Sequence, residues 1–191
     1  MARARAIEPD TLWVLVHQAF VDAGSGSLPA AASEGDALQT NDRLKTLPGW
    51  VAPILDVIRT AARSNRAEVG RGVQRLREPI RQRRASVLEM QYVTAVAVTV
   101  LARGGYADEA LGILADVTAA EAPPAYDMVV MNPFLKGLMA DPRGRDVAAR
   151  ARVQFDVLIK GIAAARAAGQ MPRYLEQPLQ DLLSSLRDTG R

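Results

Sequence analysis

The stretch "LARGGYADEALGILADV", residues 101–117, decides the fold class of this chain. Gly104 and Gly105 separate two apolar segments, and glycine at such a position ends a helix because it accepts the left-handed conformation. Beyond the turn, Ala110, Leu111 and Leu114 recur at the spacing of one helix face. The stretch therefore predicts two helices joined by a tight turn.

The segment before this turn predicts a helix that is covered on several sides. Ser86 and Glu89 form a capping box, the signature of a helix start. Apolar residues between Val93 and Leu101 leave little polar surface, as in a helix packed against several neighbours. The β-branched residues here would also suit a buried strand. We prefer a helix ending near Arg103, because the cap is sound and the run is long for a strand.

The remaining chain repeats the helical pattern, and no alternating strand or hairpin signal is found. We expect an all-α fold of about seven to nine helices. The expected helices cover residues 9–24, 50–63, 66–79 (opened by a second capping box, Asn65 with Glu68), 86–103, 107–120 (Ala107, Ala110, Leu111, Leu114 and Val117 inward), 125–142 as one helix interrupted at Asn132–Pro133 or two short ones, 146–168 (Phe155, Leu158, Ile159 and Ile162 on one face), and a final helix after Pro172 or Pro178 with Leu175, Leu179, Leu182, Leu183 and Leu186 inward.

One segment breaks the pattern. "GSGSLPAAASEG", residues 24–35, is built from small residues with glycine and proline. Such a composition buries little apolar area, so we expect a flexible loop or linker there. At 191 residues the chain has the length of one domain, and we expect a single all-α domain over residues 1–191.

The hairpin over residues 92–124 resembles a tetratricopeptide repeat. In "GGYADEALGILADV" the turn is followed by Asp108 and Glu109, and Ala110 and Leu114 match the small and large apolar positions of the second repeat helix. The run from Pro133 to Arg143 has the pattern P-F-L-x-x-L-x-x-D-P-R. It is similar to segments that often follow the last repeat in multidomain signalling proteins of this type. The resemblance implies antiparallel hairpins stacked as a short superhelix.

That resemblance covers only this hairpin. Its first helix departs from the family pattern at Thr94, where a large aromatic is usual, and at Val98, where glycine or alanine is usual. The alternative is an irregular helical bundle, whose hairpins obey the same packing rules.

Composition excludes several kinds of chemistry. The chain has no cysteine and one histidine, His17, so thiolate sites and a histidine-based metal cluster are excluded within one chain. We expect His17 to be a packed boundary residue. Carboxylates such as Asp108 and Glu109 lie at helix starts, where they favour the helix dipole. We therefore expect no catalytic residue, cofactor or metal, and no enzyme.

Membrane insertion is not indicated. The longest apolar run, Tyr92 to Ala102, is shorter than the roughly 20 residues that cross a bilayer. The N-terminal "MARARAIEPDTLWVLVHQAF" is a poor signal peptide because acidic residues precede its apolar run. We expect a cytoplasmic protein or a soluble piece of something larger.

Arginines gather in residues 59–84, where nine arginines face two glutamates. Two sets stand at helical i, i+4 or i, i+3 spacing, Arg71 with Arg75 and Arg77 with Arg81 and Arg84. Each set is therefore expected to share a face and to repel itself unless an anion or an acidic partner lies opposite. The candidate partner- or anion-binding residues are Arg71, Arg75, Arg77, Arg81 and Arg84. The alternative is a solvated helix face that pairs internally with acidic residues.

These features favour a non-enzymatic protein–protein interaction module, an adaptor, regulator or scaffold segment that offers a helical groove to a peptide or partner helix. We place that groove on the helices over 66–79 and 86–103. One alternative is an anion or nucleic-acid binder through residues 59–84, although the segment has no aromatic residue to stack on a base. Another is a helical enzyme or ligand-binding domain. The expected partner is another protein, with an acidic surface or a second copy of the chain left open.

Overall fold

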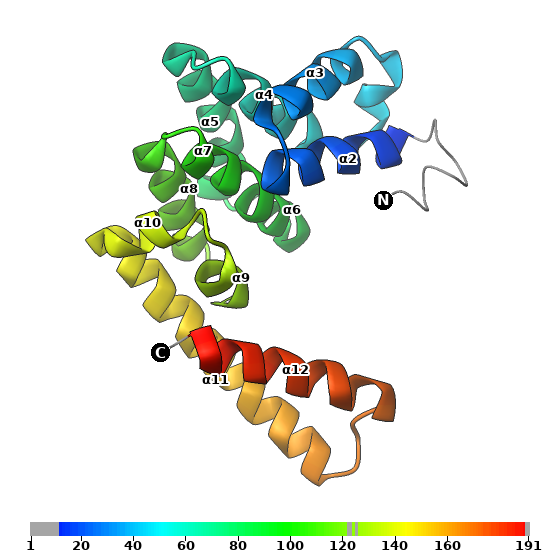
Figure 1. The fold of residues 1–191 in the computed structure, drawn as a ribbon, viewed down its shortest axis with the longest axis vertical. Coiled ribbons are helices and arrows are strands. Elements are labelled where there is room, and N and C mark those ends of the chain that lie inside the picture. The colour runs from blue at the N-terminus through cyan, green and yellow to red at the C-terminus, as the bar shows by residue number, and fades with distance from the viewer. Residues whose placement is uncertain (1–11, 122–123, 125, 190–191) are drawn as a thin grey trace. The chain divides into compact units, whose positions relative to one another are not determined.

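The computed structural model describes residues 12–121, 124 and 126–189, and all regular structure in this part of the chain is helical (Figure 1). The all-α prediction is confirmed, and no strand replaces the helix over 86–103 in the described residues. The chain divides into two compact units, Met1–Ala122 and Pro123–Arg191. We describe each by itself, and the expectation of one domain stays a prediction.

Unit 1 consists of three antiparallel hairpins in chain order. Its helices are α2 (Leu12–Ser25), α3 (Leu28–Gln39), α4 (Val51–Ala62), α5 (Arg66–Arg81), a composite helix of α6 (Val87–Tyr92), the π-helical η2 (Val93–Val98) and α7 (Thr99–Arg103), and α8 (Ala107–Ala119), with a short 3₁₀ turn, η1 (Asp42–Thr46), before α4. The expected start of the first helix at Pro9 lies outside the described residues.

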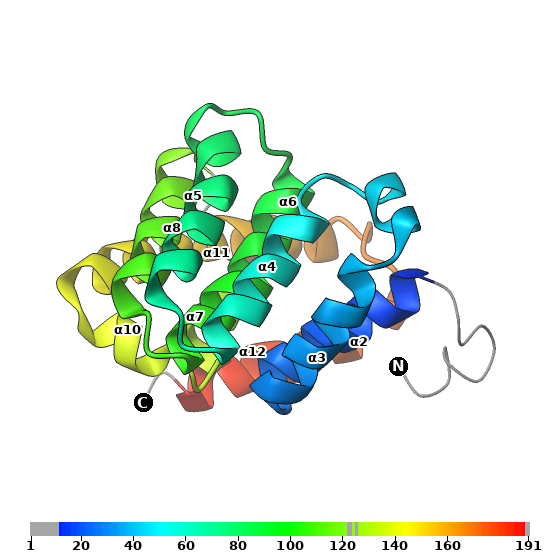
Figure 2. The same ribbon diagram turned by 90° about the horizontal axis from the view of Figure 1, so that it is seen from above.

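The composite helix is the centre of unit 1. It contacts α2, α4 and α8, and Val93, Ala97 and Leu101 are fully buried. Figure 2 shows α4, α7 and α8 close together, as these contacts require. The sequence correctly predicts a helix covered on several sides, starting at the Ser86 cap. Its π-helical middle was not predicted, because hydrophobic spacing does not distinguish α from π turns over six residues.

The turns follow the predicted chemistry. Asn65 caps α5 by accepting the Glu68 backbone N–H at 3.2 Å, and Ser86 accepts that of Glu89 at 3.1 Å. Gly105 after α7 has φ +81°, which glycine adopts without the steric cost of a side chain. This turn sets α8 antiparallel to the central helix.

The prediction of a flexible loop or linker over residues 24–35 is wrong, because most of these residues belong to α3. Ser27 caps the helix, with its Oγ accepting from the Ala30 backbone, and a proline lies in the first turn, where it is tolerated. Ala31, Ala32 and Gly35 are buried, since α3 packs against α2 and α4. Small residues that suggested a linker instead permit a close helix approach.

The arrangement of hairpins bears on the expected superhelix. In a stack of repeats each unit contacts only its neighbours. Here α2 of the first hairpin also contacts η2 and α7 of the third. This contact is typical of a bundle closed around a central helix, and the tetratricopeptide-like superhelix stays a prediction.

Unit 2 contains α9 (Tyr126–Met131), α10 (Lys136–Ala140), α11 (Pro142–Ala167) and α12 (Arg173–Thr189). The expected interruption at Asn132–Pro133 separates α9 from α10. Asp141 caps α11 by accepting the Arg143 backbone N–H at 2.8 Å, so this helix begins earlier than the predicted residue 146. The buried side chains of the unit include Val129, Leu135, Leu138, Val147 and Ala151.

Three residues expected to face inward do not. Ala107 is exposed at the first turn of α8. Leu158 and Leu175 are 58% and 44% exposed, whereas Phe155, Ile159 and Ile162 of the expected inward face of α11 are half-buried. None of the described helices combines the length and sustained hydropathy that a membrane span needs.

Candidate functional site

The arginines of α5 lie on two flanks of that helix, on either side of the buried face formed by Val69, Val73, Leu76 and Ile80. Arg75 points to α4, whereas Arg77 and Arg81 point to α8. Arg77 and Arg81 share one flank as their spacing predicts, whereas Arg84 of the same predicted set lies beyond the last residue of α5. The acidic groups opposite them belong to this same chain.

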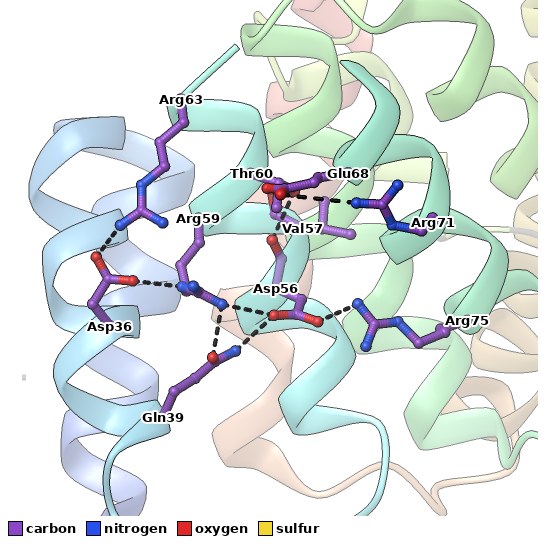
Figure 3. A network of polar contacts seen from close by, with 10 residues as sticks. All are labelled: Asp36, Gln39, Asp56, Val57, Arg59, Thr60, Arg63, Glu68, Arg71 and Arg75. Atoms are coloured by element: carbon purple, nitrogen blue, oxygen red, sulfur yellow. Dashed lines mark hydrogen bonds and ion pairs between the residues drawn. The ribbon is translucent and has the colours of Figure 1, made fainter. Parts of the chain in front are cut away.

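On the α4 side, Asp56 is the hub of a network that joins three helices (Figure 3). Its carboxylate accepts from Arg75 of α5, from Arg59 at 2.8 Å and from Gln39 of α3 at 2.6 Å. The network therefore connects α3, α4 and α5 through one carboxylate that two guanidinium groups and an amide share.

Arg59 extends this network to α3. Its Nε donates to Asp36 at 2.6 Å, and Arg63 donates to the other oxygen of the same carboxylate. The hydrogen bond from Arg59, reinforced by the positive charge of Arg63, lowers the pKa of Asp36 despite partial desolvation. Asp36 is therefore a stable anion at neutral pH.

On the α8 side, Asp116 is the second hub. It accepts a bidentate pair of hydrogen bonds from Arg77 at 2.6 and 3.2 Å, and a third from Arg81 at 2.9 Å. The Arg77 and Asp116 side chains are only 17% and 13% exposed. Bidentate geometry and partial burial make this the strongest kind of surface ion pair.

Gly112 explains how Arg77 reaches this position. A Cβ at Gly112 would lie 2.7 Å from the Arg77 Nη1 atom, well inside van der Waals contact. The arginine therefore lies flat over a glycine one turn before Asp116.

The remaining candidate arginines have weaker local partners. Arg71 lies 3.8 Å from Glu68 of its own helix, with its side chain 69% exposed. Arg84 donates to the side chain of Gln82. Of the five candidate residues, then, the structure brings three into interhelical ion pairs and leaves Arg71 and Arg84 at the surface.

His17 is a packed boundary residue, as its position predicts. Its Nδ1 lies 2.8 Å from the Trp13 carbonyl, which can only accept, so Nδ1 carries the proton. Its Nε2 lies 3.1 Å from the Tyr92 hydroxyl. The ring belongs to an aromatic cluster in which Trp50 stacks on Tyr92 with centroids 4.6 Å apart. Both ring nitrogens of His17 therefore make hydrogen bonds within unit 1.

A hollow of about 140 Å³ is lined by Leu15, Glu34, Ala37, Leu38 and Asn41. Its single carboxylate, Glu34, offers no second titratable group for acid–base work. No group of three or more histidines and carboxylates among the described residues can hold a metal ion.

Comparison of the chain with protein-family models, with curated proteins and with solved structures finds no match. The geometry above therefore carries the functional argument alone.

Sequence reasoning missed the acidic hubs Asp36, Asp56 and Asp116. Nothing in the order of residues pairs an aspartate with an arginine 19 to 39 positions away. Two local signals exist. Asp56 and Arg59 stand at i, i+3 spacing and form an ion pair within α4, and Gly112 is a glycine inside a helix four residues before Asp116, which is typical of a site where another group approaches closely.

Proposed function

We propose that this chain is a non-enzymatic protein–protein interaction module, and that α11 offers its binding surface to an amphipathic helix with acidic flanks. The observation that carries the proposal is the exposure of Val153 and Val157, which are 64% and 65% exposed. They are four residues apart and so share one face of the helix. Exposed apolar side chains that cluster are a mark of interaction sites.

The charge of α11 supports an acidic partner. Residues 142–167 contain six basic side chains against two acidic ones. Arg150 and Lys160 lie three residues before Val153 and three after Val157, hence on the same side of the helix. The ion pair between Arg150 and Asp146, at 3.2 Å, is more than half exposed, and such pairs hold their partners weakly. A helix with apolar anchors between acidic residues would match this surface.

The rival anion-binding function of residues 59–84 draws less support. Arg75, Arg77 and Arg81 have carboxylate partners within the chain, and an incoming phosphate would have to replace them. The groove expected on the helices over 66–79 and 86–103 stays a prediction, as does a cytoplasmic location.

The test compares the wild type with Val153→Asp/Val157→Asp and with Val21→Asp, an exposed valine of α2 as the matched control. Each chain is immobilised and exposed to native lysate at low and moderate salt, after circular dichroism has shown equal helicity. We expect a discrete protein, rich in acidic amphipathic helix, that binds the wild type and the control but not the double variant.

Equal capture of the protein by all three chains would refute the proposal that α11 is the binding surface. Recovery of nucleic acid that is lost with salt would favour the basic segment instead. Sedimentation of each isolated chain tests whether a second copy of this chain binds to α11. A dimer that forms in the wild type and the control but not in the double variant would show that it does.

A further inference from the structure

Two arginines of the basic segment lie outside both ion-pair networks. Arg83 and Arg84 follow the end of α5 and are exposed. Neither has an ion-pair partner among the residues that the structure describes, and the Arg84 side chain donates to Gln82. They precede Ala85, Ser86 and Val87, which places two available cations three and two residues before an exposed serine.

We propose that Ser86 is a phosphorylation site for a serine/threonine kinase whose peptide-binding cleft is acidic. Arg83 and Arg84 would be recognised by carboxylates of that cleft, since guanidinium groups bind carboxylates in a bidentate and directional way. Val87, immediately after the serine, would fill an apolar subsite. This inference goes beyond the proposed function and uses residues of unit 1 alone.

The local structure makes the serine accessible. Residues 82–86 form the irregular connection between α5 and α6, and Val87 and Leu88 are 63% and 56% exposed. The first buried side chain of α6 is Met90. The first turn of this helix can therefore open and enter a cleft in an extended form without exposing the core.

Backbone and hydroxyl geometry agree with this accessibility. Arg83 has φ +54°, a conformation that non-glycine residues seldom adopt. Extension of the segment would return Arg83 to a negative φ and remove this backbone strain. In the cap of α6, Ser86 Oγ is the acceptor of the Glu89 N–H. The cap does not require the hydroxyl proton, which the kinase must remove.

The chemistry is transfer of the γ-phosphoryl group of magnesium-bound ATP. Ser86 Oγ forms a bond to the γ-phosphorus while the bond from that phosphorus to the bridging oxygen breaks, and ADP leaves with that electron pair. The hydroxyl proton passes to the catalytic aspartate of the kinase. The product carries about −1.5 to −2 charge beside the exposed Val87 and Leu88.

The experiment incubates the full chain with magnesium-ATP and the catalytic subunit of a cyclic-AMP-dependent protein kinase, a kinase with an acidic peptide cleft. The variants are Ser86→Ala, Arg83→Ala/Arg84→Ala and Ser27→Ala. Ser27 is the matched control, because it is also an exposed helix cap but has no arginine in the six residues before it. A synthetic peptide of residues 79–92 reports recognition of the sequence without the fold.

We expect one phosphate per wild-type chain, mapped to Ser86 by mass spectrometry, unchanged in Ser27→Ala and lost in Ser86→Ala. The arginine variant should react at least about tenfold more slowly, the ratio expected from lost charge-assisted hydrogen bonds. Phosphorylation of the peptide but not of the chain would overturn the proposal, since the fold would then shield Ser86. Reaction of neither, or equal reaction of Ser86→Ala, would overturn it as well.

Discussion

Replacing Asp116 by alanine tests whether the second acidic hub holds α5 against α8. The substitution leaves Arg77 without its bidentate partner while its side chain remains 17% exposed. Breaking a buried ion pair costs roughly 3–5 kcal/mol, whereas a surface pair contributes about 0–1 kcal/mol. The intermediate burial of this pair places the expected loss at about 2–3 kcal/mol, a fall in Tm of roughly 10 °C for a unit of this size.

The two tryptophans of the chain provide a local assay. Trp13 and Trp50 both belong to unit 1, so tryptophan fluorescence during urea unfolding reports this unit alone. We expect Arg77→Ala to be costlier than Arg81→Ala, because Arg81 is 49% exposed and makes one bond to the carboxylate.

Arg71→Ala is the matched control on the same helix. Its guanidinium lies 3.8 Å from Glu68 and is mostly exposed, so the free energy of unfolding should change by less than about 0.5 kcal/mol. The reasoning is refuted if Asp116→Ala destabilises unit 1 no more than this control does. It is also refuted if Arg81→Ala costs more than Arg77→Ala.

Two further predictions concern α11 and the acid limit of stability. Gly144→Ala should destabilise unit 2 by about 3 kcal/mol, the upper end of the usual cost of overpacking, because the added Cβ would lie 2.0 Å from the Leu138 carbonyl oxygen, a backbone atom that no rotamer change can move. Circular dichroism should show the loss while the tryptophan fluorescence of unit 1 stays unchanged. Equal melting of the wild type and the variant would contradict this prediction. Asp36→Asn should make the free energy of unfolding of unit 1 less dependent on pH in acid. Arginine pairing lowers the pKa of Asp36 in the folded state. The stability that this carboxylate contributes is therefore complete above its unfolded pKa near 3.9, and it is lost as pH falls through the folded pKa. Urea unfolding at pH 7 and pH 3 measures this, and an equal pH dependence in both chains would exclude the role assigned to Asp36.

The helices of the core were accessible from sequence because their signals are local. The caps at Asn65 and Ser86 and the left-handed Gly105 each act within one turn of the chain. The buried character of the central helix also follows from its own composition. The prediction for residues 24–35 failed because its signal is not local. Alanine, glycine and serine occur both in linkers and in closely packed helices, and only contact with the neighbouring helices α2 and α4 distinguishes the two.

The arginines of α5 show where sequence reasoning ends. Their spacing determined that Arg77 and Arg81 share one flank of the helix, and it wrongly extended that set to Arg84, which lies beyond the end of α5. Which anion faces them depends on the helices beside α5. The tertiary structure places Asp56 of α4 and Asp116 of α8 there, and it leaves Arg83 and Arg84 at an exposed turn. Helix periodicity fixes the direction of a side chain from its own axis, whereas the packing of distant segments decides what that side chain contacts.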